Sequence, residues 1–252
     1  RTQQIEWISN IQSAIEEDRM RLHFQTIQPT RNGMEDGRHF EILLRMLGPD
    51  GKNIPPDTFI PIAEKFDMMP TIDRWVISTT LQWLHNNPAK AEEIHLCSIN
   101  LSGHSLGDES MLDFIQNEFT RKKVSPQKIC FEVTETAAIN SLEQAIHFMR
   151  DVKQLGCQFA LDDFGAGMSS FAYLKNMPVD YLKIDGSFIK DMLDDPINRA
   201  MVVSINEIGQ VMGLKTIAEY VENDQIKQAL VEIGVDYLQG YGIARPAPLC
   251  DR

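Results

Sequence analysis

The sequence predicts an α/β fold of the (β/α)8 class, the TIM barrel. Short apolar segments rich in Ile, Val, Leu and Phe alternate with longer segments of helical periodicity along the 252 residues. This alternation is typical of a parallel sheet covered by helices, and the length suits one barrel domain. A doubly wound open sheet has the same local alternation and is the alternative fold.

The expected strands and helices follow one another in a regular order. Strands are expected at residues 39–46, 94–101, 128–133, 158–161, 181–184, 215–218 and 236–238. Helices are expected at residues 56–64, 71–86, 111–122, 142–155, 197–212 and 223–233. Ser141 is placed to cap the helix at 142–155, and Gly156 is placed to end it. Gly213 and Gly234 follow the next two helices in the same way.

A further helix is expected at residues 2–18, where isoleucines form one apolar stripe: Ile5, Ile8, Ile11 and Ile15. Such a stripe packs on the barrel or leads into it from an upstream module. We therefore divide the chain into an N-terminal connector helix, residues 1–18, and a barrel domain, residues 19–252.

The composition excludes some functional classes. Hydrophobic residues make up 43% and charged residues 24%, as in ordinary globular domains. The net charge of −12 argues against a basic groove for long nucleic acid, but not against a small anion held through metal. No apolar segment reaches the length that spans a bilayer, so no membrane contact is expected of this domain. The four cysteines lack Cys-x-x-Cys spacing, which predicts reduced thiols in a cytoplasmic protein.

Two adjacent carboxylates, Asp162 and Asp163, stand at the end of an apolar strand. Neighbouring residues on a strand point to opposite faces, so the two can share a cation only where the strand bends. Gly165 and Gly167 follow them and permit that bend. Because two like charges repel unless a cation joins them, the pair predicts a metal site.

Polar side chains interrupt most of the other strands at or near their carboxyl ends. They are Glu41, Asn100, Glu132, Lys183, Glu219 and Gln239, with Glu135 and Glu222 just beyond. Each of these residues, taken alone, could have a purely structural role, either as a buried group with a hydrogen-bond partner or as a cap of a turn. Together, so many unpaired carboxylates would destabilise an apolar barrel mouth, which is the rim where barrel enzymes place their active sites.

Carboxylate and amide oxygens favour hard ions such as Mg²⁺ or Mn²⁺, and an adjacent acidic pair lets one carboxylate bridge two of them. Two such ions activate water for attack on a phosphoryl group. Lys183 could orient that water and stabilise negative charge. A Schiff base at Lys183, as in a barrel lyase or aldolase, is the alternative, but acidic surroundings raise a lysine's pKa and disfavour it.

These strings resemble the EAL-domain family of cyclic di-GMP phosphodiesterases, from about Leu22 to Pro248. The motifs that carry the resemblance are Glu41-Ile42-Leu43-Leu44-Arg45, Phe59-Ile60-Pro61-Ile62-Ala63-Glu64, Asn100-Leu101-Ser102, Glu132-Val133-Thr134-Glu135, Asp162-Asp163-Phe164-Gly165, Lys183-Ile184-Asp185, Ala218-Glu219 with Glu222, and Gln239-Gly240-Tyr241 leading to Arg245-Pro246. The resemblance implies a TIM-like barrel whose first strand is antiparallel to the others, with residues 19–252 as the EAL domain. It also implies hydrolysis of cyclic di-GMP to linear pGpG.

The resemblance implies a role for each site residue. One metal would be held by Glu41, Asn100, Glu132 and Asp162, and the other by Asp162, Asp163 and Glu219. The catalytic residues would be Glu41, Lys183, Glu219 and Gln239, and the substrate would contact Leu44, Arg45, Gln239 and Arg245. Glu135 and Glu222 would fix the loop after Asp163, which includes Phe164, Gly165 and Met168. This loop would couple the site to a homodimer interface. Family members often carry sensor or GGDEF modules upstream, so the resemblance implies such a module and leaves open a membrane-anchored whole protein around a cytoplasmic domain.

Three positions depart from the family pattern. Ile42 replaces Ala and should be harmless if it faces the helices. Asp67 stands where Gly is frequent, so a left-handed backbone there would be mildly strained. Met168 replaces an aromatic residue and could alter the loop or the dimer. All implied ligands are present, which favours an enzyme over a non-catalytic cyclic di-GMP receptor, the alternative function.

Overall fold

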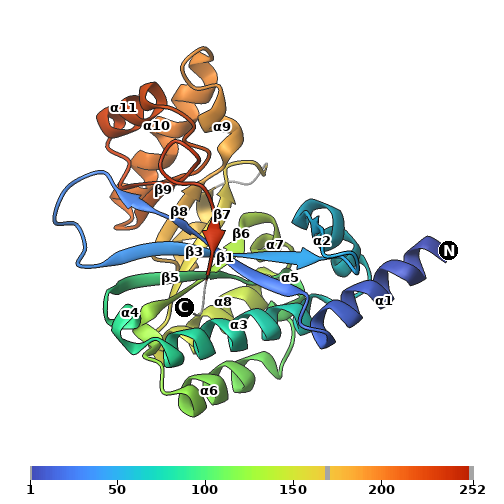
Figure 1. The fold of residues 1–252 in the computed structure, drawn as a ribbon. Coiled ribbons are helices and arrows are strands. Elements are labelled where there is room, and N and C mark those ends of the chain that lie inside the picture. Colours follow the sequence, from blue (N-terminus) through green and yellow to red (C-terminus); the bar gives the residue numbers. More distant parts are fainter. Residues whose placement is uncertain (1, 168–170, 250–252) are drawn as a thin grey trace.

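The protein, described by a computed structural model over residues 2–167 and 171–249, is built around one sheet (Figure 1). Most of its strands were expected within a few residues of their observed bounds. They are β1 (Met20–Thr26), β2 (Gln28–Pro29), β3 (Arg38–Leu47), β4 (Asn53–Ile54), β5 (Ile94–Asn100), β6 (Ile129–Thr134), β7 (Gln158–Phe164), β8 (Tyr181–Ile184), β9 (Lys215–Ala218), β10 (Tyr237–Leu238) and β11 (Ala247–Pro248).

The sheet closes into a barrel. From β3 through β5, β6, β7, β8 and β9 to β10, neighbouring strands are parallel. β1 pairs antiparallel with β3, and β2, which follows after Ile27 alone, pairs antiparallel with β10. The Ile27 N–H donates to His39 O over 2.9 Å, and the Thr30 N–H donates to Asp236 O over 2.9 Å. The predicted barrel with an antiparallel first strand is confirmed, and the doubly wound alternative is wrong.

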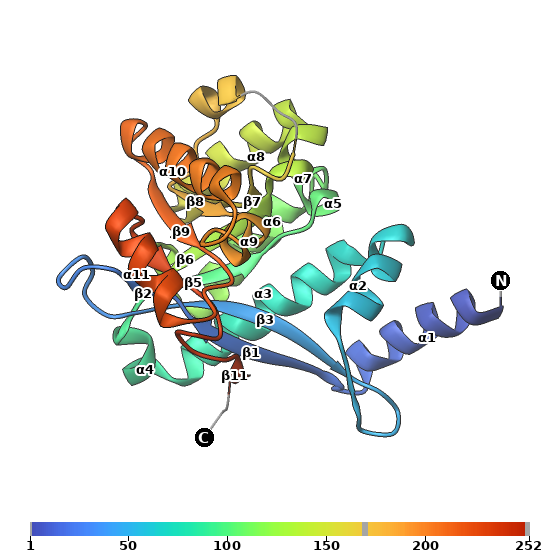
Figure 2. The same cartoon turned by 90° about the horizontal axis from the view of Figure 1, so that it is seen from above.

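The sequence analysis missed the antiparallel strand itself. β1 alternates apolar Met20, Leu22 and Phe24 with polar residues, as a half-buried strand does. The prediction that Glu41 lies near the end of a strand also needs correction, because β3 continues for six residues beyond it. β1 pairs with β3 along its whole length, so the two form a long ribbon that extends past the ring (Figure 2).

Helices cover the outside of the sheet, and the six long ones after residue 50 were expected to within two residues. The helices are α2 (Pro56–Lys65), α3 (Met69–Asn86), α4 (Pro88–Glu92), α5 (Gly103–Leu106), α6 (Met111–Lys122), α7 (Glu135–Asn140), α8 (Leu142–Leu155), α9 (Gly186–Lys190), α10 (Pro196–Val211) and α11 (Asp224–Ile233), with 3₁₀ turns at Pro126–Lys128 and Phe171–Asn176. The short helices α4, α5, α7 and α9 carry too few residues for a periodic signal.

The predicted helix ends are confirmed at two glycines and wrong at one serine. Gly156 and Gly234 adopt left-handed conformations, with φ of 114° and 93°, directly after α8 and α11. Gly213 also has a positive φ, of 74°, but lies two residues past Val211, the last residue of α10, with Met212 between them. The Ser141 side chain makes no capping hydrogen bond. Because α7 ends at Asn140, Ser141 serves both helices, and only its carbonyl oxygen bonds to α8, at Ala145 N.

The first helix, α1 (Thr2–Glu16), packs through its C-terminal half. Ile11 and Ala14 are fully buried, whereas Ile5 is 66% exposed. The Arg19 guanidinium, just past the helix, donates to Leu47 O over 2.8 Å and so ties the helix to the end of β3. The N-terminal half projects away from the sheet (Figures 1 and 2). Its role as a connector stays a prediction.

The lower interior of the barrel is a solid floor rather than a channel. Its buried side chains are Ile27, Leu96, Cys130, Ala160, Tyr181, Ile217 and Tyr237. Ile42 is buried on the outside of the sheet beside Ile72 and Val76 of α3, so it faces the helices as expected. Asp67 has φ of 55°, so it adopts the left-handed conformation that was expected to be mildly strained at this position. Among the described helices, none combines the length and apolar character that crossing a membrane requires.

Candidate metal centre

Five carboxylates converge above this floor in two groups that share one member. Oxygen atoms of Glu41, Glu132 and Asp162 lie within 4.8 Å of one another, and so do those of Asp162, Asp163 and Glu219. We call these five residues together with Lys183 the acidic centre. The shared position of Asp162 is the one that the sequence analysis assigned to a bridging ligand.

A bulge in β7 lets two adjacent residues face the same centre. The pairing of β7 with β8 shifts register between Leu161 and Phe164, and Asp163 within the shift has φ of 50°. Asp162 Oδ1 accepts the Asp163 N–H over 2.8 Å, which holds the turn. The bend expected from the paired carboxylates is therefore present, at Asp163, two residues before Gly165.

Among the described residues, Lys183 is the one cation that lies inside the acidic centre. Its ammonium group is fully buried and donates hydrogen bonds to Glu41 Oε1 and, over 3.0 Å, to Glu132 Oε2. Glu219 Oε1 lies 3.3 Å away. Burial alone would lower the pKa of Lys183, but Glu132 and Glu41 outweigh it and raise the pKa well above its ordinary value. A lysine that stays protonated cannot act as a Schiff-base nucleophile, so this alternative is disfavoured.

One lysine cannot neutralise five carboxylates. Burial, then the charge of Glu41, raises the pKa of Glu132 well above its ordinary value. Burial and Asp162 do the same for Glu219, and burial raises the pKa of Asp163 to about 6. For Glu41 the burial effect is overcome by Lys183, and its pKa is lowered. The centre thus carries excess negative charge that a further cation would stabilise.

The donor set fits hard divalent ions. Glu132 Oε1 is buried and accepts no hydrogen bond from the described residues, which leaves it available to a ligand. Asn100 pairs with Glu132 at the ends of β5 and β6, and its side chain hydrogen-bonds to Glu41. All these donors are oxygen atoms, the preference of Mg²⁺ and Mn²⁺.

The loop after Asp163 is fastened by Glu135, the first residue of α7. The buried carboxylate of Glu135 accepts the Gly165 N–H over 2.9 Å and the Tyr173 hydroxyl over 2.5 Å. Phe164 is buried and stacks on Phe171, with ring centroids 5.6 Å apart. The predicted role of Glu135 in fixing this loop has a structural basis, whereas Met168 lies outside the described residues.

A buried aspartate that the sequence analysis missed holds the turn after Asn100. Asp73 Oδ2, on α3, accepts bonds from Ser102 N over 3.0 Å, Ser102 Oγ over 2.7 Å and Ser105 Oγ over 2.5 Å. Burial raises the pKa of Asp73 despite these bonds. Asp73 therefore joins α3 to the strand end that presents Asn100.

Two cavities flank the acidic centre. The first, of about 450 Å³, is called the site cavity and is lined by Glu41, Arg45, Glu219, Tyr220, Gln239 and Tyr241, among others. The second, of about 310 Å³, is called the apolar cavity and is lined by Leu44, Ile60, Ile72, Asn100, Glu132 and others. Leu43 and Arg45 line both, and Leu43 was not predicted.

The remaining predicted residues occupy different places. Gln239 is buried and donates to Gln25 Oε1 over 3.1 Å, while its own Oε1 has no partner within residues 2–167 and 171–249. Glu222 is exposed at the edge of the site cavity. Arg245 lies 4.8 Å from the ring centre of Tyr241, whose ring borders that cavity. The substrate contact of Arg245 and the loop contact of Glu222 stay predictions.

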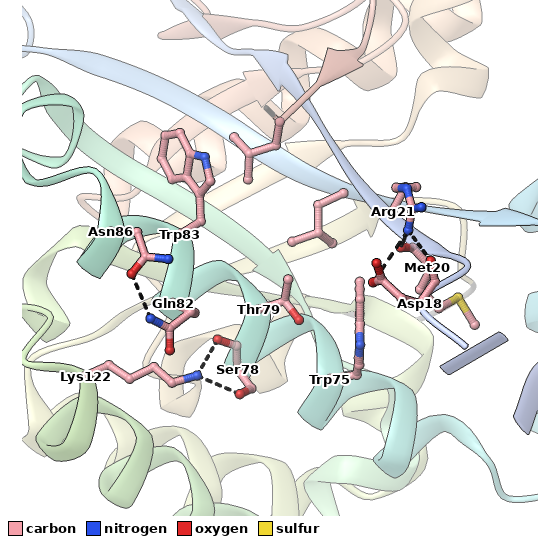
Figure 3. A pocket seen from close by; sticks show the side chains of 12 residues that line it. Asp18, Met20, Arg21, Trp75, Ser78, Thr79, Gln82, Trp83, Asn86 and Lys122 are labelled. Carbon is pink, nitrogen blue, oxygen red and sulfur yellow. Dashed lines mark hydrogen bonds and ion pairs between the residues drawn. The ribbon is translucent and has the colours of Figure 1, made fainter. Parts of the chain in front are cut away.

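A larger cavity, of about 630 Å³, lies away from the acidic centre, between β1 and α3 (Figure 3). Its charged groups already have partners. Lys122 donates to Ser78 O and Oγ over 2.7 Å each, and Arg21 donates to Met20 O over 2.8 Å. Volume alone therefore does not identify the functional site in this fold.

Comparisons with known proteins agree with this geometry. A family model described as the EAL domain matches residues 8–246. Cyclic di-GMP phosphodiesterase PdeB of Shewanella oneidensis is 42% identical over 96% of this chain, and PdeF of Escherichia coli is 38% identical over 97%. The chain spans 28% and 32% of their lengths. The FimX EAL domain of Pseudomonas aeruginosa, solved with bound c-di-GMP, superposes with a TM-score of 0.88 at 29% identity, covering 96% of each chain.

Proposed function

Because the chain belongs to the EAL-domain family, we propose that it hydrolyses cyclic di-GMP to linear 5′-pGpG. The observation that carries the proposal is the acidic centre. Its two clusters of three carboxylate residues have Asp162 in common and lie around a protonated Lys183. Its relatives' names supply the substrate, since PdeB and PdeF are both named as cyclic di-GMP phosphodiesterases.

Two divalent cations, Mg²⁺ or Mn²⁺, fit the centre. Glu41, Asn100, Glu132 and Asp162 would hold one of them, and Asp162, Asp163 and Glu219 would hold the other. Bound there, such ions would supply Lewis acidity to water and to the phosphoryl oxygens. The raised pKa values of Glu132 and Glu219 support this assignment, because cation binding replaces protons on such carboxyls.

The chain's own side chains then orient the reactants. Within the described part of the chain, Gln239 Oε1 has no hydrogen-bond partner, so it can accept a hydrogen bond from the attacking water. Lys183 donates hydrogen bonds while keeping its charge. The water oxygen bonds to phosphorus, the P–O3′ bond breaks, and a 5′-phosphate and a 3′-hydroxyl result. Lys183 is thus an electrostatic and positioning group rather than a base.

The two cavities suit an elongated dinucleotide. Since both adjoin the acidic centre and share Arg45, one phosphodiester can lie over the centre while the nucleosides extend to either side. Arg45 lines both cavities and carries a guanidinium that can contact a phosphate. Leu44 offers apolar surface only on the side of the apolar cavity.

The chain is further proposed to act as one part of a larger cytoplasmic or membrane-anchored protein. MucR of Pseudomonas aeruginosa, named as a bifunctional diguanylate cyclase and phosphodiesterase, matches 98% of this chain but only 36% of its own length is covered. An upstream sensor or GGDEF module and a homodimer are therefore part of the proposal. Three described cysteines are buried free thiols, which suits a reducing compartment.

The test is incubation with cyclic di-GMP and either Mg²⁺ or Mn²⁺, with pGpG separated by chromatography. The proposal expects metal-dependent formation of pGpG that chelation stops. Binding of cyclic di-GMP without any product would instead identify a receptor domain, and absence of both binding and product would remove cyclic di-GMP as the ligand.

A further inference from the structure

Tyr220 is an exposed aromatic residue held in an unusual backbone conformation beside the acidic centre. It directly follows Glu219, has φ of 57°, and is 61% exposed. Left-handed φ values are uncommon for bulky side chains, and such residues concentrate at functional sites. The conformation turns the chain immediately after a proposed metal ligand.

The Tyr220 ring is seated on a glycine that leaves room for it. A Cβ atom built on Gly186, the first residue of α9, would come within 1.9 Å of Tyr220 Cδ2 and 2.7 Å of Cγ. The ring therefore lies directly against the Gly186 backbone on one side. Because the residue remains mostly exposed, much of the ring is free to contact a ligand.

Tyr220 lines the site cavity together with the groups that would hold the phosphodiester. Glu41, Glu219 and Arg45 line the same cavity, so a nucleotide whose phosphate lies over the acidic centre has its base within reach of this wall. A second exposed aromatic residue, Tyr241, lines the same cavity and is itself 61% exposed. Aromatic side chains beside a phosphate site are surfaces on which bases stack.

We propose that Tyr220 contributes to substrate binding by stacking on one purine base of the cyclic dinucleotide, with Gly186 supporting the ring from behind. The proposal deepens the proposed function and rests on it for the identity of the ligand. A tyrosine phenol has an ordinary pKa of about 10, so the ring is neutral near neutral pH. A neutral ring meets the base without repelling the nearby phosphate.

Three variants distinguish the contribution of the Tyr220 ring from that of its left-handed backbone conformation. Tyr220→Phe keeps the ring, Tyr220→Ala removes it, and Tyr220→Gly removes it while suiting a φ of 57°. Binding of cyclic di-GMP is measured by calorimetry with Ca²⁺ in place of Mg²⁺, and initial rates of pGpG formation are measured with Mg²⁺. Tyr220→Ala and Tyr220→Gly should weaken binding roughly 5- to 100-fold and raise KM alike, the range that stacking of one base supplies. Tyr220→Phe should retain most of the affinity.

A merely structural role would give a different pattern. It would raise the Mg²⁺ concentration needed for half-maximal rate and lower kcat, and Tyr220→Gly would be less impaired than Tyr220→Ala. Unchanged affinity in both ring-less variants, or an equal loss in Tyr220→Phe, would also overturn the proposal. If the unaltered chain binds without turnover, only the proposed function fails and the affinities still decide the role of Tyr220. If it does not bind, both are overturned.

Discussion

Lys183 donates a hydrogen bond to Glu132 Oε2 over 3.0 Å, and neither side chain is exposed to solvent. Such a pair is stable only while both partners are present, because a lone buried charge has neither water nor a counterion. Glu132 nevertheless keeps a raised pKa and an unpartnered Oε1, so the lysine compensates its charge only in part. The centre is therefore built to accept more positive charge.

Replacing Lys183→Met should destabilise the metal-free protein, since it leaves Glu41 and Glu132 without their cation. We expect a loss of about 3–5 kcal/mol in the free energy of unfolding at pH 8, measured by urea denaturation. Added Mg²⁺ should recover part of it. Lys52→Met, whose side chain is 85% exposed, is the matched control and should change stability by less than about 0.5 kcal/mol. Equal losses in both variants would contradict the account.

Replacing Glu41→Gln should remove activity while preserving the fold. The amide keeps the shape of the side chain but loses the negative charge that binds both the divalent cation and Lys183. We expect turnover of cyclic di-GMP to fall by roughly 10³-fold or more, about 4 kcal/mol in transition-state stabilisation. His85→Ala, on the exposed face of α3, should leave turnover within about twofold. A similar loss in the two variants would place the site elsewhere.

Stability should depend on pH in opposite ways with and without metal. The pKa of Asp163 is raised to about 6 in the folded protein, and those of Glu132 and Glu219 are also raised. A carboxyl whose pKa rises on folding stabilises the folded state below its unfolded pKa of about 4, and that contribution is lost as pH rises through the folded value. Divalent cations bind the deprotonated form and should reverse the loss.

The measurement is Tm with and without saturating Mg²⁺ at pH 5 and pH 8. We expect the metal to raise Tm by roughly 5–10 °C at pH 8, the shift for a ligand at about 100 times its Kd, and by much less at pH 5. An equal rise at both pH values would show that protons and metal do not compete for these carboxyls.

Replacing Asp73→Ala should loosen the turn that presents Asn100. Three donors on Ser102 and Ser105 lose their acceptor, at a cost of about 1–3 kcal/mol per buried group left unpaired. We expect a several-fold higher Mg²⁺ concentration for half-maximal rate, measured by metal titration at saturating substrate. Asp113→Ala, exposed in the first turn of α6, is the control. An unchanged metal requirement in Asp73→Ala would limit Asp73 to a structural role.

The acidic centre could be predicted from sequence because its members interrupt apolar strands. Glu132 and Lys183 are conspicuous in strands whose other residues are buried and apolar, and parallel strands bring their carboxyl ends to one rim. The order of the strands and the long helices could be predicted because the spacing of apolar residues differs between strands and helices. These features depend on local patterns, which the chain displays residue by residue.

What the sequence did not reveal depends on contacts between distant segments. Asp73 lies in an ordinary amphipathic helix. Its buried carboxylate accepts hydrogen bonds from Ser102 and Ser105, which are about thirty residues away in the sequence. The left-handed backbone of Tyr220 and the space above Gly186 appear only when β9 and α9 are brought together. Gln25, which accepts a hydrogen bond from Gln239, belongs to β1, a strand that was not predicted from the sequence.

The central claim is that water, activated at the acidic centre, cleaves one phosphodiester of cyclic di-GMP. Its most direct test is turnover in H₂¹⁸O with Mg²⁺ or Mn²⁺, followed by mass spectrometry of the product. The account predicts pGpG with one ¹⁸O in its 5′-phosphate, formed only with metal and lost in Glu41→Gln. No product with either metal from a folded sample, or product without the label, would contradict it.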